Sequence, residues 1–172
     1  METFLTKLSS YNFINYIFPG VLLNYFYSKI FDIELLNNCT EIEKLFIYYF
    51  IGLFVSRIGS LILGPAVQKI NFITYVPYSD YVTAKAKDKD IETLLEVTNT
   101  YRTLAALFLF LILICLLYMI FNFLNYCSKN INQFMFIVSG TLLSIMFFIC
   151  FVVSYKKQVG YIKKSVTKTL TK

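Results

Sequence analysis

The sequence lacks the residues that most often mark a catalytic or metal site. It contains no histidine, so the commonest general base and the commonest metal ligand are both missing. Tryptophan is also absent. The four cysteines form no C-x-x-C pair, which argues against a zinc site; they are Cys39, Cys115, Cys127 and Cys150. We therefore expect neither a metal nor a cofactor.

Recognisable catalytic motifs are missing as well. The sequence has no phosphate-binding glycine-rich loop and no nucleophile elbow. The acids and bases between residues 80 and 96 have the spacing of a solvated helix face rather than of an active site. These absences predict that the chain is not an enzyme.

Charge is scarce, and apolar residues are abundant. Only 15% of the 172 residues are charged and 58% are hydrophobic, whereas a soluble domain has about 25% charged residues. The apolar residues form four blocks, at 11–31, 45–67, 104–124 and 134–155. Each block reaches the length of about 20 residues that a helix needs to cross a bilayer. The sequence predicts an all-α integral membrane protein with four transmembrane helices.

The distribution of lysine and arginine predicts the orientation. Residues 68–103 carry five basic residues and residues 156–172 carry six lysines and no acid, while the other two connections carry few. By the positive-inside rule these basic segments and both termini lie in the cytoplasm, in the inner membrane of a bacterium. Cys39 and Cys127 would lie outside, where they either form a disulfide or stay as free thiols.

This topology divides the chain into four segments. They are a first transmembrane hairpin (1–67), a cytoplasmic helical segment (68–103), a second transmembrane hairpin (104–155) and a basic tail (156–172). Ser79 is the predicted N-cap of one amphipathic helix over 80–102 that continues into the third span. Its apolar stripe either packs within the chain or forms a subunit contact or sensor face.

The tail has three possible roles. Six lysines without an acid can bind anionic lipid headgroups, at about 1 kcal/mol per lysine near the surface. They can also bind the phosphates of a nucleotide or oligonucleotide. A third interpretation is a topology signal with no ligand. Tyr161 is the one aromatic residue among the lysines, which favours lipid over nucleic acid.

Arg57 is the one charged residue near the middle of any of the four apolar blocks, since Lys29 lies at the end of the first. A charge deep in a bilayer costs at least about 2.5 kcal/mol, so Arg57 should face protein or water. The first span offers polar partners, because it holds Asn12, Asn15 and Asn24. Pro19 and Gly20 should kink that span and free the carbonyl of Asn15. Arg57 would either brace this kink or line an aqueous path and attract anions.

A stripe of small residues runs along the second span. Gly52, Ser56, Ser60 and Gly64 recur every four residues, which lets another helix approach closely. Gly140 and Ser144 repeat the pattern more weakly in the fourth span. Either stripe can be a seam within the chain or between copies. Four small helices do not readily enclose a pore, so a conducting role implies several copies.

Several short strings resemble a group of small bacterial membrane proteins. They are LSSYNFINYIFPG at 8–20, SRIGS at 56–60, Pro65 and NTYR at 99–102. Over roughly the first 120 residues the chain resembles four-helix membrane effectors of anti-phage defence operons, such as the channel subunit of the Hailong system. That resemblance implies a tetrameric pore, held closed by DNA oligomers that a partner nucleotidyltransferase makes.

The residues and the resemblance together favour a homo-oligomeric pore effector gated from the cytoplasm by a ligand or a soluble partner. Pro19 and Gly20 would be its hinge, and Arg57 would set the field near the constriction. The candidate sensing residues are Lys85, Lys87, Lys89, Tyr101 and Arg102. One rival is a non-conducting anchor that recruits a soluble partner. A small transporter is the other, although no intramembrane acid is present to couple protons.

Overall fold

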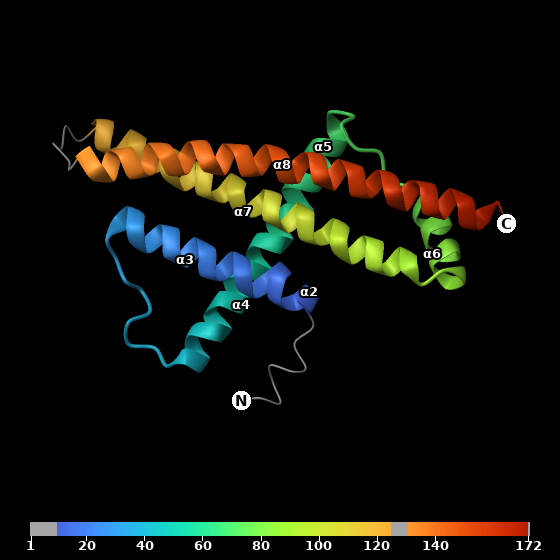
Figure 1. Cartoon of the computed structure of the whole chain (residues 1–172), viewed down its shortest axis with the longest axis horizontal. Helices are drawn as coiled ribbons and strands as arrows, with labels where there is room; N and C mark the ends of the chain where they lie inside the picture. Colours follow the sequence, from blue (N-terminus) through green and yellow to red (C-terminus); the bar gives the residue numbers. More distant parts are fainter. Residues whose placement is uncertain (1–9, 125–130, 172) are drawn as a thin grey trace.

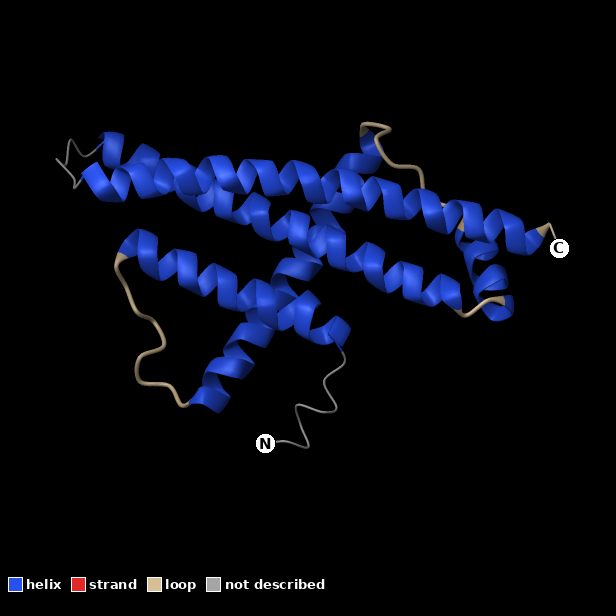
Figure 2. Cartoon of the chain, in the orientation of Figure 1, coloured by secondary structure: helices blue, strands red, loops and turns tan. Residues whose placement is uncertain are grey.

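A computed structural model describes residues 10–124 and 131–171, and these are helical with short connections and no strand (Figures 1 and 2). The elements in chain order are α2 (Ser10–Asn12), η1 (Phe13–Ile17), α3 (Phe18–Phe31), α4 (Glu41–Ile58), η2 (Gly59–Leu63), α5 (Gly64–Lys69), α6 (Tyr78–Lys87), α7 (Asp90–Leu124) and α8 (Ile131–Leu170). The all-helical prediction is confirmed for this part of the chain.

Three helical stretches are long and apolar enough to cross a membrane. They are Glu41–Lys69, Asp90–Phe121 and Phe134–Leu170. The first predicted span, which forms the helical stretch α2–η1–α3, is not among them. Its asparagines and tyrosines lower its mean hydropathy below that of the other three. The chain is therefore a membrane protein with three candidate spans.

The longest elements, α7 and α8, form an antiparallel hairpin along the molecule (Figure 1). Aromatic rings stack between them: the centroid of Phe108 lies 4.9 Å from that of Phe147 and 5.6 Å from that of Phe151. The helix α8 continues to Leu170, so most of the segment predicted as a separate basic tail is an extension of the fourth apolar helix. We call the end where α7 begins and α8 finishes the charged end of the hairpin.

The single helix predicted for 80–102 is wrong, because it is broken at Asp88 and Lys89. Asp88 is extended, and its carboxylate accepts a hydrogen bond from the backbone N–H of Asp90 at 3.0 Å. This bond caps the new helix α7, a role that short acidic side chains favour. Ser79 is not the N-cap of α6, since Pro77 occupies that position. From Asp90 onward α7 does run unbroken into the third apolar block, as predicted.

The break lets α6 fold back onto the hairpin. Ala84 and Ile91 are fully buried with Ile162 and Val166 of α8, and Leu94 and Leu95 pack against them. The apolar stripe of the segment is thus covered, for these residues, by the chain's own α8.

Each of the two π-helical turns precedes a proline. The turn η1 ends two residues before Pro19, and η2 ends two residues before Pro65. A proline inside a helix has no N–H and its ring clashes with the carbonyl four residues earlier. The wider π turn accommodates that clash. The predicted irregularity at Pro19 therefore takes the form of a π turn.

We call the continuous helical stretch α2–η1–α3 the first helix. It crosses α4 with the two backbones in contact (Figure 1). A Cβ added at Gly20 would lie 2.0 Å from the carbonyl oxygen of Tyr48. One added at Gly52 would lie 1.6 Å from the carbonyl oxygen of Tyr16. Both positions require glycine, because a side chain at either one would collide with the backbone of the other helix. Gly52 therefore belongs to a seam inside the chain, and Gly20 is a packing residue at the position predicted to be a hinge.

The cysteines can be placed only in part. Cys39, Cys115 and Cys150 are free thiols. Cys127, the other half of the possible disulfide, lies outside the described residues.

Candidate functional site

Asn15 and Ser56 meet in a buried polar cluster between the first helix, α4 and α7. Asn15 is 1% exposed, and its Nδ2 donates to Ser56 Oγ and to the hydroxyl of Tyr11, both at 3.4 Å. The hydroxyl of Thr103 lies 3.0 Å from Ser56 Oγ and 3.0 Å from the carbonyl oxygen of Asn99. Since a carbonyl can only accept, Thr103 donates to Asn99 and accepts from Ser56.

This cluster continues to the charged end of the hairpin. The side chain of Asn99 and the guanidinium of Arg102 both lie within electrostatic reach of the Tyr11 hydroxyl. A polar path therefore runs from the helix crossing to Arg102. Of the other predicted polar residues in the first helix, Asn12 and Asn24 are half-buried.

Arg57 lies on the outer face of α4 and is exposed in the single chain. Its neighbours on that face, Phe54 and Leu61, are 61% and 71% exposed. Arg57 does not lie opposite Pro19, as the kink-bracing interpretation required, because Tyr48 faces the adjacent Gly20. No described residue makes a hydrogen bond or an ion pair with Arg57.

The small-residue stripe divides between different neighbours within the chain. Ser56 is buried in the polar cluster, and Gly59 packs against Ala106 of α7, where an added Cβ would lie 3.1 Å from that methyl group. Gly64 faces the hydroxyls of Tyr75 and Tyr155 at 3.5 and 3.9 Å from such a Cβ. Ser60 is half-buried. Much of the predicted stripe is thus an internal seam.

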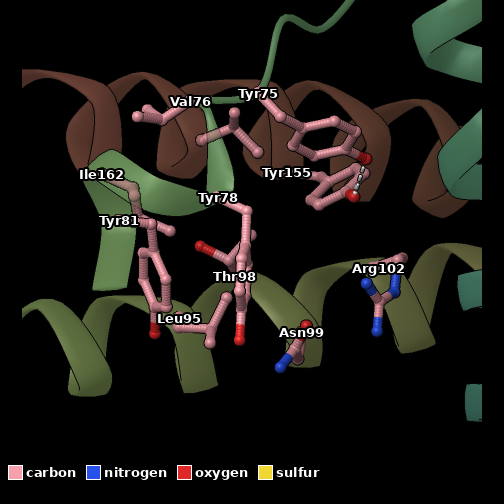
Figure 3. Close-up of a pocket in the computed structure, with 11 residues that line it drawn as sticks. Tyr75, Val76, Tyr78, Tyr81, Leu95, Thr98, Asn99, Arg102, Tyr155 and Ile162 are labelled. Atoms are coloured by element: carbon pink, nitrogen blue, oxygen red, sulfur yellow. Dashed lines mark hydrogen bonds between the residues drawn. The ribbon is translucent and has the colours of Figure 1, made fainter. Parts of the chain in front are cut away.

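A pocket of about 300 Å³ lies at the charged end of the hairpin, between the loop before α6, α6 itself, α7 and α8 (Figure 3). It is lined by Tyr75, Val76, Tyr78, Tyr81, Leu95, Thr98, Asn99, Arg102, Tyr155, Val159 and Ile162. We call it the tyrosine pocket. At one end the hydroxyls of Tyr75 and Tyr155 are hydrogen-bonded, and Arg102 reaches in from α7 (Figure 3).

Two polar atoms in this pocket are buried without a partner among the described residues. They are Nε of Arg102 and the hydroxyl of Tyr81. A buried donor without an acceptor costs about 1–3 kcal/mol. Burial and the hydrogen bond to Tyr155 raise the pKa of Tyr75 well above its ordinary value, and the charge of Arg102 offsets this only in part. Tyr75 is therefore neutral at physiological pH, and Arg102 carries the one formal charge in the lining.

Of the five predicted sensing residues, Arg102 lines the tyrosine pocket. Tyr101 packs instead in the cluster of Val67, Ile73 and Tyr155. Lys85 forms an ion pair with Glu92 at 2.7 Å, which joins α6 to α7. Lys87 lines a separate, more polar hollow together with Lys168, and Lys89 is exposed at the helix break.

Sequence reasoning missed the tyrosines of this site. Tyr75, Tyr78 and Tyr81 recur every three residues, and this spacing is the one signal that could have found them. Tyr155 closes the fourth apolar block and gave no signal of its own. Among the described residues there is no group of three or more histidine, cysteine or acidic side chains that could hold a metal ion.

Comparison with known proteins finds no protein-family model that matches the chain, and no match among curated proteins or solved structures.

Proposed function

We propose that this protein is a homo-oligomeric pore of the bacterial cytoplasmic membrane, gated from the cytoplasmic side. In this proposal all four apolar helices cross the membrane and both termini are cytoplasmic. The helical stretch from Ser10 to Phe31 is long enough for this role, at about 1.5 Å per residue against a core of about 30 Å. The lysine distribution supports the orientation.

The exposed position of Arg57 carries the proposal. Its guanidinium lies on a face that also presents Phe50, Phe54 and Leu61. In an isolated chain that face would meet lipid, where a guanidinium costs at least about 2.5 kcal/mol. A neighbouring copy or an aqueous path along this face removes the cost. Arg57 would then attract anions to the path.

The packed interior of the single chain supports an assembly. Between α4 and α7 the core is filled by Val55, Leu107 and Leu111, which have no exposed surface. Ions therefore need a path between copies, as expected for four small helices.

The polar path supports gating from the charged end. It joins the tyrosine pocket through Arg102, Asn99 and Tyr11 to the cluster that includes Ser56, the residue before Arg57. A molecule that moves Arg102 would act on the crossing of the first helix and α4. The resemblance to defence effectors then supports a role in which the opened pore depolarises the infected cell.

The test is conductance of the purified protein in planar bilayers under a chloride gradient, with Arg57→Gln beside the wild type. We expect single-channel currents, and an anion preference that falls in Arg57→Gln because the charge at the path is lost. Lys164→Gln removes another exposed charge, from α8, and should leave the reversal potential unchanged. Mass photometry reports the copy number of each sample.

An assembled wild-type protein that never conducts would overturn the pore and favour the non-conducting anchor. A channel whose selectivity ignores Arg57→Gln would remove Arg57 from the path while leaving the pore.

A further inference from the structure

The tyrosine pocket combines features that a purely structural cavity does not need. It has about 300 Å³ of space, which is at the lower end of the range for small-molecule sites. Its walls are apolar and aromatic, and none of its lining residues is acidic. Arg102 is therefore a positive charge without a counter-charge inside the lining.

The two unpartnered atoms belong to residues that line this space. Nε of Arg102 can only donate, so what it lacks is an acceptor. The side chain of Asn99 lines the pocket one turn of α7 before Arg102 and adds a neutral hydrogen-bonding group. The hydroxyl of Tyr81, from α6, is buried without a partner and can donate or accept. Tyr78 and Tyr81 extend from α6 toward α7 across the pocket (Figure 3).

We propose that the tyrosine pocket binds a small molecule with a flat apolar body and one anionic group, a carboxylate or a phosphate. The anion accepts from Arg102, whose planar fork matches the oxygens of either group. The body lies among the tyrosine rings and Val76, Leu95 and Ile162. The anionic group can come from a soluble metabolite or from the phosphate of an anionic lipid headgroup.

A ligand in the pocket would contact three helices at once. Arg102 belongs to α7, Tyr81 to α6 and Tyr155 to α8. A bound anion that draws in Arg102 also changes the field at Tyr11, which lies within electrostatic reach of that guanidinium. This consequence for gating rests on the proposed pore, whereas binding itself does not.

Binding is measured on the full chain in nanodiscs of neutral phosphatidylcholine, by calorimetric titration. The probes are benzoate, phenyl phosphate and the neutral benzyl alcohol. We expect at least one anionic probe to bind at least tenfold more tightly than benzyl alcohol. If the neutral probe binds as tightly as both anions, the pocket does not select an anion and the proposal is wrong. If neither anion binds at millimolar concentration, the proposal is also wrong.

Variants show where the probe binds. Arg102→Gln should lower the affinity for the anionic probe at least tenfold and leave the affinity for benzyl alcohol unchanged. Arg102→Lys should recover part of the lost affinity. Tyr81→Phe should lower the affinity for the anionic probe. It should not lower the melting temperature of the protein without ligand, because the Tyr81 hydroxyl has no hydrogen-bond partner in that state. Lys164→Gln, on the exposed face of α8, is the matched charge control. Equal affinity in Arg102→Gln and wild type would overturn the assignment.

Two further arms complete the test. Repeating the titration in nanodiscs that contain phosphatidylglycerol identifies the source, because a lipid ligand would compete with the soluble probe and a metabolite site would not be affected. Adding the binding probe to the bilayer recording separates the two proposals. Conductance without binding by any probe overturns the pocket alone, and binding to a protein that never conducts overturns the pore alone.

Discussion

Two glycines with opposite surroundings show what single residues contribute. Gly52 has the carbonyl oxygen of Tyr16 where its Cβ would be, at 1.6 Å, while Gly160 has nothing within 4 Å. The same methyl group therefore has opposite effects at the two sites. At Gly52 it must push two helix backbones apart, and at Gly160 it only removes the entropy cost of a helical glycine.

We expect Gly52→Ala to destabilise the protein by more than about 3 kcal/mol, since backbone cannot yield as a flexible side chain does. Gly160→Ala should stabilise it by up to about 1 kcal/mol, through helix propensity. The measurement is thermal unfolding of each variant in the same detergent, with monodispersity as the check on folding. An unchanged melting temperature for Gly52→Ala would mean that the crossing of the first two helices is looser than it appears in Figure 1.

At the scale of the element, the sequence predicted helices better than their interruptions. Long apolar blocks dictate helices because lipid supplies no partner for backbone N–H and C=O groups. The break at Asp88 was missed because Lys85 to Glu92 is locally as good a helix as its surroundings. The break accompanies tertiary packing, since with the chain folded back Ala84 and Ile91 share one buried cluster with Ile162 and Val166 of α8. The polar cluster was partly predictable from Asn15 in the first apolar block. The contact between Ser56 and Thr103 was not, because the two residues lie 47 positions apart in the sequence.

The docking of α6 onto α8 is testable through two alanines on opposite faces of α6. Ala84 is fully buried against Ile162 and Val166, and Ala86 is exposed. We expect Ala84→Leu to separate α6 from α8. The rate of amide hydrogen exchange over residues 78–87 should rise, and the affinity of the tyrosine pocket for any ligand should fall. Ala86→Leu, the same change on the solvent side, should alter neither quantity. Equal protection of α6 in both variants would show that Ala84 is not held against α8.

At the scale of the whole molecule, the chain presents one face that a single copy leaves uncovered. Phe46, Phe50 and Phe54 of α4 and Leu61 of η2 are each more than half exposed. Leu117 of α7 and Met146 of α8 are also more than half exposed, and such apolar side chains suit lipid. The face of α4 differs from them because Arg57 interrupts it. An exposed apolar face suits lipid and a partner helix equally well. A guanidinium on that face is costly in lipid, so Arg57 favours a partner helix or water.

The last prediction concerns this face. In a cysteine-free background, single cysteines at Phe46, Phe50, Phe54 and Leu61 should form disulfide-linked dimers when membranes are oxidised, because the α4 faces of neighbouring copies meet. Cross-linking should be strongest at one or two of these positions, since only residues close to the symmetry contact bring two sulfurs within reach. Leu117→Cys and Met146→Cys, which face lipid in this arrangement, should stay monomeric under the same oxidant. Efficient cross-linking at Leu117 or Met146 with none along α4 would place the contact on the α7–α8 hairpin, and would leave Arg57 to reach the aqueous interface from a lipid-facing helix.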